Sequence, residues 1–335
     1  MDSTEKALET IAPYVVRTPL VKSIELSKSL DCELYYKYEH LQTAGSVKAR
    51  GAFLKLLSAG DGEMPEGFVT ASSGNHGLSL ALAAKQAGAK FKLFMPETTP
   101  PSKIEKVKAV GVDLVLGGTS WDDANDAALA HAKTSGFKYV HAFDDDTLVL
   151  GHSTAALECL QDQPHFDVAI CSIGGGGIAK GFLGYLKSRL PDVRCYGVET
   201  YGAESMLTSF QHDKIMTLPA ITSKASGIGV RAPVKSTFDF ARQNLEGLVA
   251  VSDHASALAQ RAILDGDKQL VELAASCCIA ALQAGKIPDI KGKKVLVLLC
   301  GGNVISSELG LENTAAPKEP VFLPNRIRAQ ASFNP

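Results

Sequence analysis

The chain of 335 residues carries 34 Lys and Arg against 36 Asp and Glu, which gives a formal net charge of −2. This near balance argues against a nucleic acid or an anionic membrane as the main partner, since both are bound through an excess of positive charge. No apolar run reaches the length of a membrane span, and the opening residues MDSTEKALET lack the basic and apolar regions of an export signal. We therefore expect a cytoplasmic protein, with about two domains for this length.

Strands and helices alternate along the chain. In the first half we expect helices at residues 4–16 and 22–29, a strand at 33–38, a helix that Ser46 caps and that opens with Val47 and Lys48, a strand at 68–71, a helix at 78–86, a strand at 91–95, a helix at 103–109, a strand at 113–116, a helix at 122–134 and a strand at 139–140. An acidic loop at 144–146 then leads to a helix at 154–160.

The second half repeats this alternation. We expect strands at residues 167–173, 194–199, 248–251 and 294–299, and helices at 178–190, near Ala203, near Val234, at 254–263 and at 269–282. Alternating strands and helices with short loops predict parallel sheets covered by helices, and two such units suit the length. The tail after Glu312 is rich in proline, so we expect an extended arm there.

Seven cysteines are scattered through apolar segments: Cys32, Cys159, Cys171, Cys195, Cys277, Cys278 and Cys300. We interpret them as buried free thiols of a reducing compartment. None of the eight histidines falls in a spacing typical of metal ligands. The sequence therefore does not predict a transition-metal enzyme.

Lys48 is predicted in the first turn of its helix, where the positive end of the helix dipole disfavours an ammonium. A lysine with a lowered pKa suits Schiff-base chemistry, because only the neutral amine attacks a carbonyl. A solvated surface position is the more common explanation for a lone lysine. The interpretation therefore depends on the neighbouring motifs.

Three turns rich in glycine or serine directly follow predicted strands: SSGNHG at 72–77, GGGG at 174–177 and CGGN at 300–303. Ligands of open parallel sheets bind beyond the carboxyl ends of the strands, so we expect these turns and the Lys48 loop to face one cleft. The four glycines predict an anion site, since bare backbone N–H groups at a helix start can surround a phosphate.

Each of these motifs also has another explanation. Gly174, Gly176 and Ala179 fit the dinucleotide pattern GxGxxA, and Glu199 ends the next strand, where an NAD ribose would need a carboxylate. An NAD-dependent dehydrogenase is therefore the rival hypothesis from another class.

Side chains of the other two turns have alternatives as well. Ser72 or Ser73 can simply cap a helix, and His76 is more often a structural histidine than a base. Cys300 is an inert buried thiol in the usual case; facing the cleft, its S–H could meet a ring nitrogen without protonating it.

Together and in this order, the four motifs resemble the fold-type II pyridoxal-phosphate (PLP) enzymes, most closely the serine/threonine dehydratases and serine racemases. The resemblance covers about Thr18 to Leu311. It implies an α/β fold of two doubly wound parallel-sheet domains, like the tryptophan synthase β subunit, with the active site in the cleft between them. The implied domains are a large one, 1–48 plus 141–320, and a small one, 49–140, followed by the arm at 313–335. It also implies a homodimer.

The resemblance assigns roles to residues of this chain. Lys48 matches the lysine that bonds to the cofactor and later moves the α-proton, and Asn75 the residue that bonds the cofactor's 3-hydroxyl. The phosphate cradle matches Gly174, Gly175, Gly176 and Gly177. Cys300 takes the place of the residue that faces the pyridine nitrogen. The loop that receives the substrate carboxylate matches Ser72, Ser73, Asn75 and His76.

Ser73 also resembles the second, opposite-face acid/base of racemases. Glu199, with Ala203 and Ser205, resembles the family's structural cation site, monovalent or divalent, which gives Glu199 a reading other than a ribose ligand. Two positions depart from the pattern: Val47 stands where dehydratases usually have Phe, and residues 272–276, ELAAS, replace a Glu-Pro-x-x-Gly-like stretch near the ring.

The implied activity is PLP-dependent elimination of water from L-serine or L-threonine, which gives a 2-oxo acid and ammonia. Racemisation of an amino acid and biosynthetic β-replacement are the alternatives within the same fold. A catalytically inactive relative that binds a metabolite is a further one. The expected partner is a small amino-acid substrate.

Overall fold

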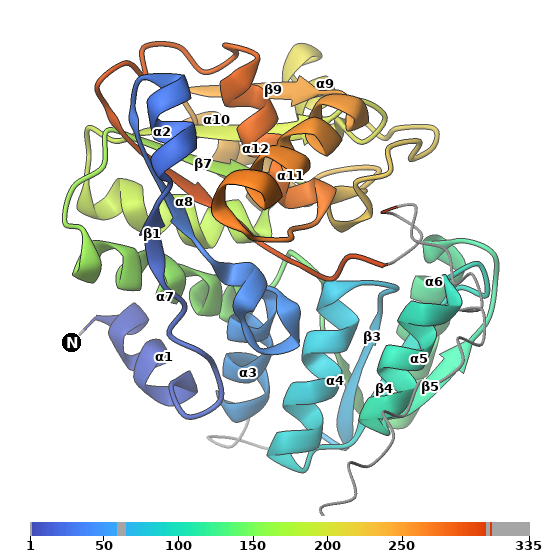
Figure 1. The fold of residues 1–335 in the computed structure, drawn as a ribbon. Coiled ribbons are helices and arrows are strands. Elements are labelled where there is room, and N and C mark those ends of the chain that lie inside the picture. The colour runs from blue at the N-terminus through green and yellow to red at the C-terminus, as the bar shows by residue number, and fades with distance from the viewer. Residues whose placement is uncertain (1, 59–64, 306–308, 310–335) are drawn as a thin grey trace, which may run out of the picture. The chain divides into compact units, whose positions relative to one another are not determined.

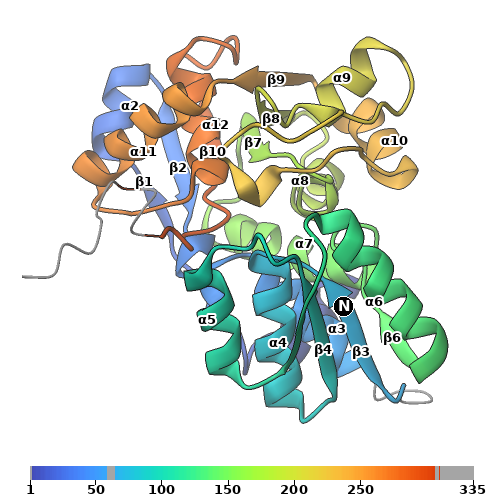
Figure 2. The ribbon, with the colours of Figure 1, turned by 90° about the vertical axis from the view of Figure 1, so that its right-hand side faces the viewer.

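Two β-sheets, each covered by helices, organise the computed structural model of this chain (Figures 1 and 2). The structure describes residues 2–58, 65–305 and 309. Residues Met1–Asn303 form one unit; of the second unit, Val304–Pro335, only Val304, Ile305 and Leu309 are described. The expected arm at 313–335 therefore lies outside the described residues.

The larger sheet has six strands in the order β1-β2-β10-β7-β8-β9. Its strands are β1 (Leu20–Lys22), β2 (Glu33–Lys37), β7 (Val168–Ser172), β8 (Arg194–Thr200), β9 (Gly247–Val251) and β10 (Lys294–Leu298). All neighbours are parallel except β1, which runs antiparallel to β2 at one edge. The central strands β7 and β10 read VAICS and KVLVL, the continuous apolar sequence expected of strands buried on both faces.

Helices of the larger sheet are α2 (Ile24–Leu30), α8 (Gly177–Arg189), α9 (Ser205–Gln211), α10 (Lys235–Asn244), α11 (Asp253–Asp267) and α12 (Leu273–Gln283). Helix α12 is apolar along its whole length and packs on β7, β8 and β9, while α8 packs on β7 and β8. All seven cysteines are free and buried, as predicted.

The smaller sheet has four parallel strands in the order β5-β4-β3-β6. Its strands are β3 (Gly67–Ala71), β4 (Phe91–Met95), β5 (Asp113–Leu116) and β6 (Phe137–Tyr139). The helices around it are α3 (Lys48–Leu57), α4 (Asn75–Ala87), α5 (Pro101–Val110) and α6 (Trp121–Ser135). Two more helices, α1 (Ser3–Ile11) and α7 (Asp146–Asp162), pack on α3, and α7 also packs on α8. The alternation of strands and helices thus confirms the predicted α/β class with two parallel-sheet units.

Several predicted boundaries are wrong for local reasons. The first helix ends at Ile11 rather than residue 16, because Pro13 has no N–H to continue it. Strand β1 was not predicted: α2 begins after Ser23, whose side chain accepts from Leu26 N–H, and Leu20–Lys22 pairs with β2 instead. Helix α7 begins at Asp146, with Asp145 as its cap, so the expected acidic loop is shorter.

Candidate active site

Helix α3 begins at Lys48, and the loop before it is paired with the CGGN turn. Ser46 is extended and forms a bridge with Gly301, and Val47 N–H donates to Cys300 O at 3.0 Å. The predicted cap is confirmed by its hydrogen bond, since Ser46 Oγ accepts from Lys48 N–H at 3.3 Å; the helix itself begins at Lys48, and Val47 before it already has helical backbone angles. The pairing brings the loop of Lys48 and the end of β10 together, as the sequence predicts.

The Lys48 side chain is half-buried. Its Nζ donates to Ala142 O at 2.9 Å. Burial lowers the pKa of Lys48 to about 8, against a smaller opposing influence of the Cys300 and Cys171 thiols. A substantial fraction of the side chain is therefore a neutral amine near pH 8.

The tetraglycine turn follows β7 and leads into α8. Gly176 has φ of +88°, which favours glycine, and it caps α8 without a side-chain bond. A Cβ on Gly174 would lie 2.9 Å from Ile228 Cα, and one on Gly177 would lie 2.7 Å from Phe143 O. One on Gly175 would overlap the Phe143 ring. The turn therefore needs its glycines, and it leaves the backbone N–H groups at the start of α8 uncovered by a cap.

The SSGNHG turn follows β3, and α4 begins at Asn75 with Gly74 as its cap. Neither serine caps the helix: Ser72 Oγ accepts from Gly74 N–H at 3.2 Å within the turn itself, and Ser73 is half-buried. His76 is buried, with Nε2 3.2 Å from Thr70 Oγ1. Burial, helped by the charge of Lys48, lowers the pKa of His76 to about 3, so it is neutral and structural at neutral pH.

Asn75 connects two turns of the site. Its Nδ2 lies 3.0 and 3.1 Å from the two carboxylate oxygens of Glu272, and its Oδ1 accepts from Asn303 Nδ2 at 2.8 Å. Glu272 Oε1 also accepts from Asn303 N–H at 2.9 Å. Glu272 belongs to the stretch that departs from the resembled pattern, and the structure places it beside Asn75.

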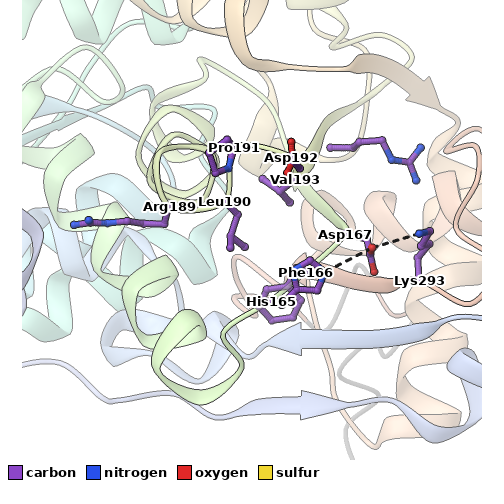
Figure 3. Close-up of a pocket in the computed structure, with 10 residues that line it drawn as sticks. His165, Phe166, Asp167, Arg189, Leu190, Pro191, Asp192, Val193 and Lys293 are labelled. Atoms are coloured by element: carbon purple, nitrogen blue, oxygen red, sulfur yellow. Dashed lines mark hydrogen bonds and ion pairs between the residues drawn. The ribbon is translucent and has the colours of Figure 1, made fainter.

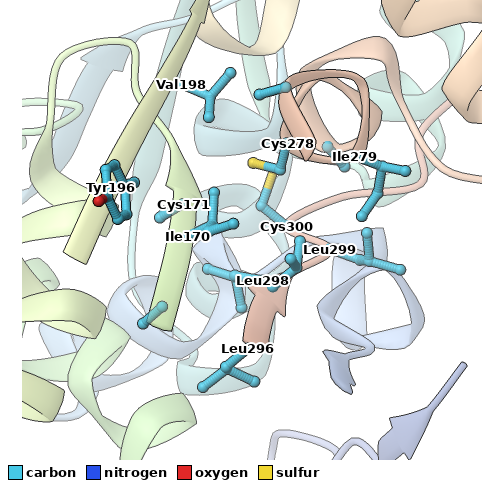
Figure 4. Close-up of a cluster of buried hydrophobic side chains, with 14 of the residues drawn as sticks. Ile170, Cys171, Tyr196, Val198, Cys278, Ile279, Leu296, Leu298, Leu299 and Cys300 are labelled. Atoms are coloured by element: carbon cyan, nitrogen blue, oxygen red, sulfur yellow. The ribbon is translucent and has the colours of Figure 1, made fainter. Parts of the chain in front are cut away.

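Cys300 directly follows β10, and its side chain lies beside Cys278 among the apolar residues of the sheet (Figure 4). Its Sγ is 3.5 Å from Ser172 Oγ, and the residue is 8% exposed. Burial and then the nearby charge of Glu272 raise the pKa of Cys300 to about 12. Cys300 is therefore a neutral thiol at physiological pH.

A lysine amine, a serine-rich turn, a glycine cradle and a strand-end thiol thus come from segments that follow β2, β3, β7 and β10, respectively. The model of the family described as pyridoxal-phosphate-dependent enzyme matches residues 11–301. The chain belongs to this family.

Within this family, the chain is similar to threonine ammonia-lyases and to a serine racemase. The chain is 37% identical to an L-threonine ammonia-lyase of Geobacter sulfurreducens over 300 residues, which is 90% of this chain and 74% of that one. It is 34% identical to an L-threonine ammonia-lyase of Thermotoga maritima, with 91% and 75% covered. Maize serine racemase has the same fold, with a TM-score of 0.87, 30% identity, and 92% of this chain and 95% of that chain covered.

The residues present fit the cofactor of this PLP family. The tetraglycine turn packs closely on Phe143 and Ile228, and no side chain caps the N–H groups at the start of α8, where a phosphate would bind. Lys48 is a partly neutral amine. Glu199 does not fit the rival NAD reading, since its two carboxylate oxygens accept from Met206 N–H and Leu207 N–H at 3.0 and 2.7 Å.

The expected cation site lies at the start of α9. Glu199 is fully buried there, and burial raises its pKa to about 8. Ala203 and Ser205 are buried beside it, and Ser205 Oγ has no hydrogen-bond partner within the described part of the chain. Over those same residues, no three side chains of His, Cys, Asp or Glu gather as metal ligands, so a cation here would have the Glu199 carboxylate together with hydroxyl and backbone oxygens.

A buried ion network supports the first turn of α3. Arg50 Nε and Nη2 donate to Glu39 at 2.8 Å each, and its Nη1 and Nη2 donate to Glu158 at 2.9 and 2.7 Å. Lys37 Nζ lies 2.5 Å from Glu158, and all four side chains are at most 1% exposed. Although burial alone would raise it, Arg50 holds the pKa of Glu39 below its usual range. The charges of the two cations and the two carboxylates therefore cancel within the network.

Sequence reasoning missed two segments of the site. In residues 140–143, Ala142 O accepts from Lys48 Nζ and Phe143 packs against the tetraglycine turn. This segment lies at the end of a predicted strand, where ligands of parallel sheets bind, so the same reasoning would have indicated it. The short 3-10 helix η4 (Ser226–Ile228) covers Gly174, and a Cβ on Gly227 would lie 3.1 Å from Glu272 Oε2. No motif marks this loop.

A surface cavity of about 290 Å³ lies at the amino ends of β7, β8 and β10, the ends opposite to the site (Figure 3). Its charged residues are engaged within the protein: Lys293 pairs with Asp167 at 3.5 Å, and the Arg194 guanidinium donates to Pro288 O and Asp289 O.

None of the described helices combines the length and the apolar character needed to cross a membrane.

Proposed function

We propose that this enzyme eliminates water from L-threonine and L-serine, giving a 2-oxo acid and ammonia. The observation that carries the proposal is the half-buried Lys48 amine, whose pKa is about 8, in one site with the tetraglycine turn. The names of the two threonine ammonia-lyases that it resembles support the substrate class.

PLP would be held by Lys48, by Asn75 at its 3-hydroxyl, by Cys300 at its ring nitrogen, and by the backbone of Gly174, Gly175, Gly176 and Gly177 at its phosphate. When bound, PLP supplies an aldehyde and a ring that accepts electron density from the substrate Cα. The Cys300 thiol, neutral at physiological pH, would leave the ring nitrogen unprotonated, which favours rapid loss of a β-hydroxyl.

The remaining roles belong to side chains of this chain. The neutral amine of Lys48 takes the proton from the substrate Cα, for which its lowered pKa prepares it. The turn of Ser72, Ser73, Asn75 and His76 receives the substrate carboxylate at the start of α4, where backbone N–H groups favour an anion. Since the His76 imidazole is bonded to Thr70, His76 shapes this turn and does not act as a base.

Racemisation is the second candidate, because maize serine racemase shares the fold and Ser73 stands where racemases have their second acid/base. Incubation of the PLP-loaded enzyme with L-threonine and L-serine distinguishes the two. We expect 2-oxobutanoate and pyruvate, measured with lactate dehydrogenase and NADH, together with stoichiometric ammonia. D-serine without pyruvate on chiral chromatography would replace this proposal by a racemase, and neither product would indicate β-replacement or an inactive relative.

A structural cation at Glu199, Ala203 and Ser205 is also proposed, supported by the unpartnered Ser205 Oγ beside a buried carboxylate. One carboxylate among neutral oxygens favours a cation of low charge. We expect potassium to raise the melting temperature of the wild type by about 2–6 °C over choline at equal ionic strength. The Glu199→Gln variant should lose most of this shift. Equal shifts in both proteins would argue against the site, and a shift with magnesium alone would indicate a divalent ion.

We propose three further assignments. The division into 1–48 plus 141–320 and 49–140 is supported by the membership of the strands in the two sheets, although α1 packs on α3 and α7. A homodimer and a cytoplasmic location rest on the family resemblance alone.

A further inference from the structure

Asn303 ends the CGGN turn, and no role has been assigned to it above. Its Nδ2 donates to Ala44 O at 2.7 Å and to Asn75 Oδ1 at 2.8 Å. Its backbone N–H donates to Glu272 Oε1 at 2.9 Å. One residue therefore touches the loop of Lys48, the SSGNHG turn and Glu272.

The loop of Lys48 is shaped to admit this side chain. A Cβ on Gly45 would lie 2.8 Å from Asn303 Oδ1, and Gly45 has φ of +68°. Gly302 N–H donates to Gly45 O at 2.9 Å, which fixes the two backbones next to each other. A side chain at position 45 would displace Asn303.

The direction of each amide follows from chemistry. The carbonyl of Ala44 only accepts hydrogen bonds, so the NH2 group of Asn303 must face it. That places Asn303 Oδ1 toward the donor Lys106 Nζ, 3.5 Å away. Asn75 must then present its Oδ1 to Asn303 and its NH2 group to the Glu272 carboxylate. Donation thus runs in one direction, from Lys106 through Asn303 and Asn75 to Glu272.

We propose that Asn303 is a positioning residue, which holds the Asn75 amide with its N–H side available as the donor to the cofactor's 3-oxygen. This rests on the proposed function, in which Asn75 binds that oxygen. Without Asn303, only the Glu272 carboxylate still orients the Asn75 amide. The amide is then held less firmly, and whenever its carbonyl turns toward the cofactor it repels an oxygen that is rich in electrons. Cofactor binding would weaken even though no group that touches the cofactor had changed.

Asn303→Asp tests the direction of donation, because aspartate has the same shape but only accepts. A carboxylate oxygen at this position would face two other acceptors, Ala44 O and Asn75 Oδ1, and repel both. We therefore expect the Asn75 side-chain amide to flip. We expect the Kd of PLP for the apoprotein to rise about tenfold or more, measured by titration of the visible absorption. The kcat for L-threonine should fall, with a smaller change in KM. An unchanged Kd would overturn the proposal.

A double-variant cycle separates positioning from a general structural effect. If Asn303 acts through Asn75, Asn75→Ala plus Asn303→Ala should bind PLP as weakly as Asn75→Ala alone. If the two fold-changes multiply, Asn303 acts independently and the proposal is wrong, while the proposed function stands. If the wild type binds no PLP, the proposed function fails and this inference fails with it.

Discussion

Replacing Lys48 with alanine is expected to abolish turnover, with kcat lowered by more than about 10⁴-fold. A general base alone contributes about 10²–10⁴-fold, and Lys48 is also the residue proposed to bond to the cofactor aldehyde. Mass spectrometry after borohydride reduction should find the cofactor mass on Lys48 in the wild type and no attached cofactor in the variant. The visible absorption of the bound cofactor should disappear as well.

The lowered pKa adds a pH dependence to the same experiment. Below about pH 8 the Lys48 side chain is increasingly an ammonium, which cannot attack an aldehyde, so the rate of covalent capture of PLP by the apoprotein should rise from pH 6 to pH 8 and then level off. Lys85→Ala removes an exposed lysine in the last turn of α4 and should leave both capture and turnover at wild-type values. Turnover retained by Lys48→Ala would refute the assignment.

The sequence predicted the parts of the site that lie where a strand ends. GGGG and CGGN follow β7 and β10 of the larger sheet, and this alone places them at one edge of that sheet; SSGNHG follows β3 of the smaller sheet. The unusual position of Lys48 in a first helical turn could also be predicted, because the effect of the helix dipole on a lysine depends only on where the helix begins. These conclusions depend on local pattern and topology.

Other features depend on pairing across long sequence separations. The Ser46 side chain caps the helix as predicted, but the pairing of its extended backbone with Gly301 was not predicted. Val47, which departs from the resembled pattern, is completely buried. Glu272 meets Asn75 only because α12 starts where β10 ends, which no spacing in the sequence encodes. Contacts of this kind become visible only once the two sheets are folded together.

The ion network beneath Lys48 should carry the largest effect on stability. Arg50→Met leaves Glu39 and Glu158 buried with Lys37 as the one remaining cation of the network, and we expect a loss of about 3–5 kcal/mol of unfolding free energy in urea at pH 7. Arg17→Met removes a pair with Asp162 that is 49% and 38% exposed, so it should cost at most about 1 kcal/mol.

The loss caused by Arg50→Met should also depend on pH. In the wild type, the pKa of Glu39 is lowered in the folded state, so its ionisation contributes stability at neutral pH that disappears as the pH falls through that pKa. In Arg50→Met this contribution is absent, and a protonated Glu39 is cheaper to bury than a carboxylate. The difference in unfolding free energy between the wild type and the variant should therefore become smaller from pH 7 to pH 4. A gap that is small at pH 7, or that widens on acidification, would show that the network does not hold the first turn of α3 in place beneath the Lys48 amine.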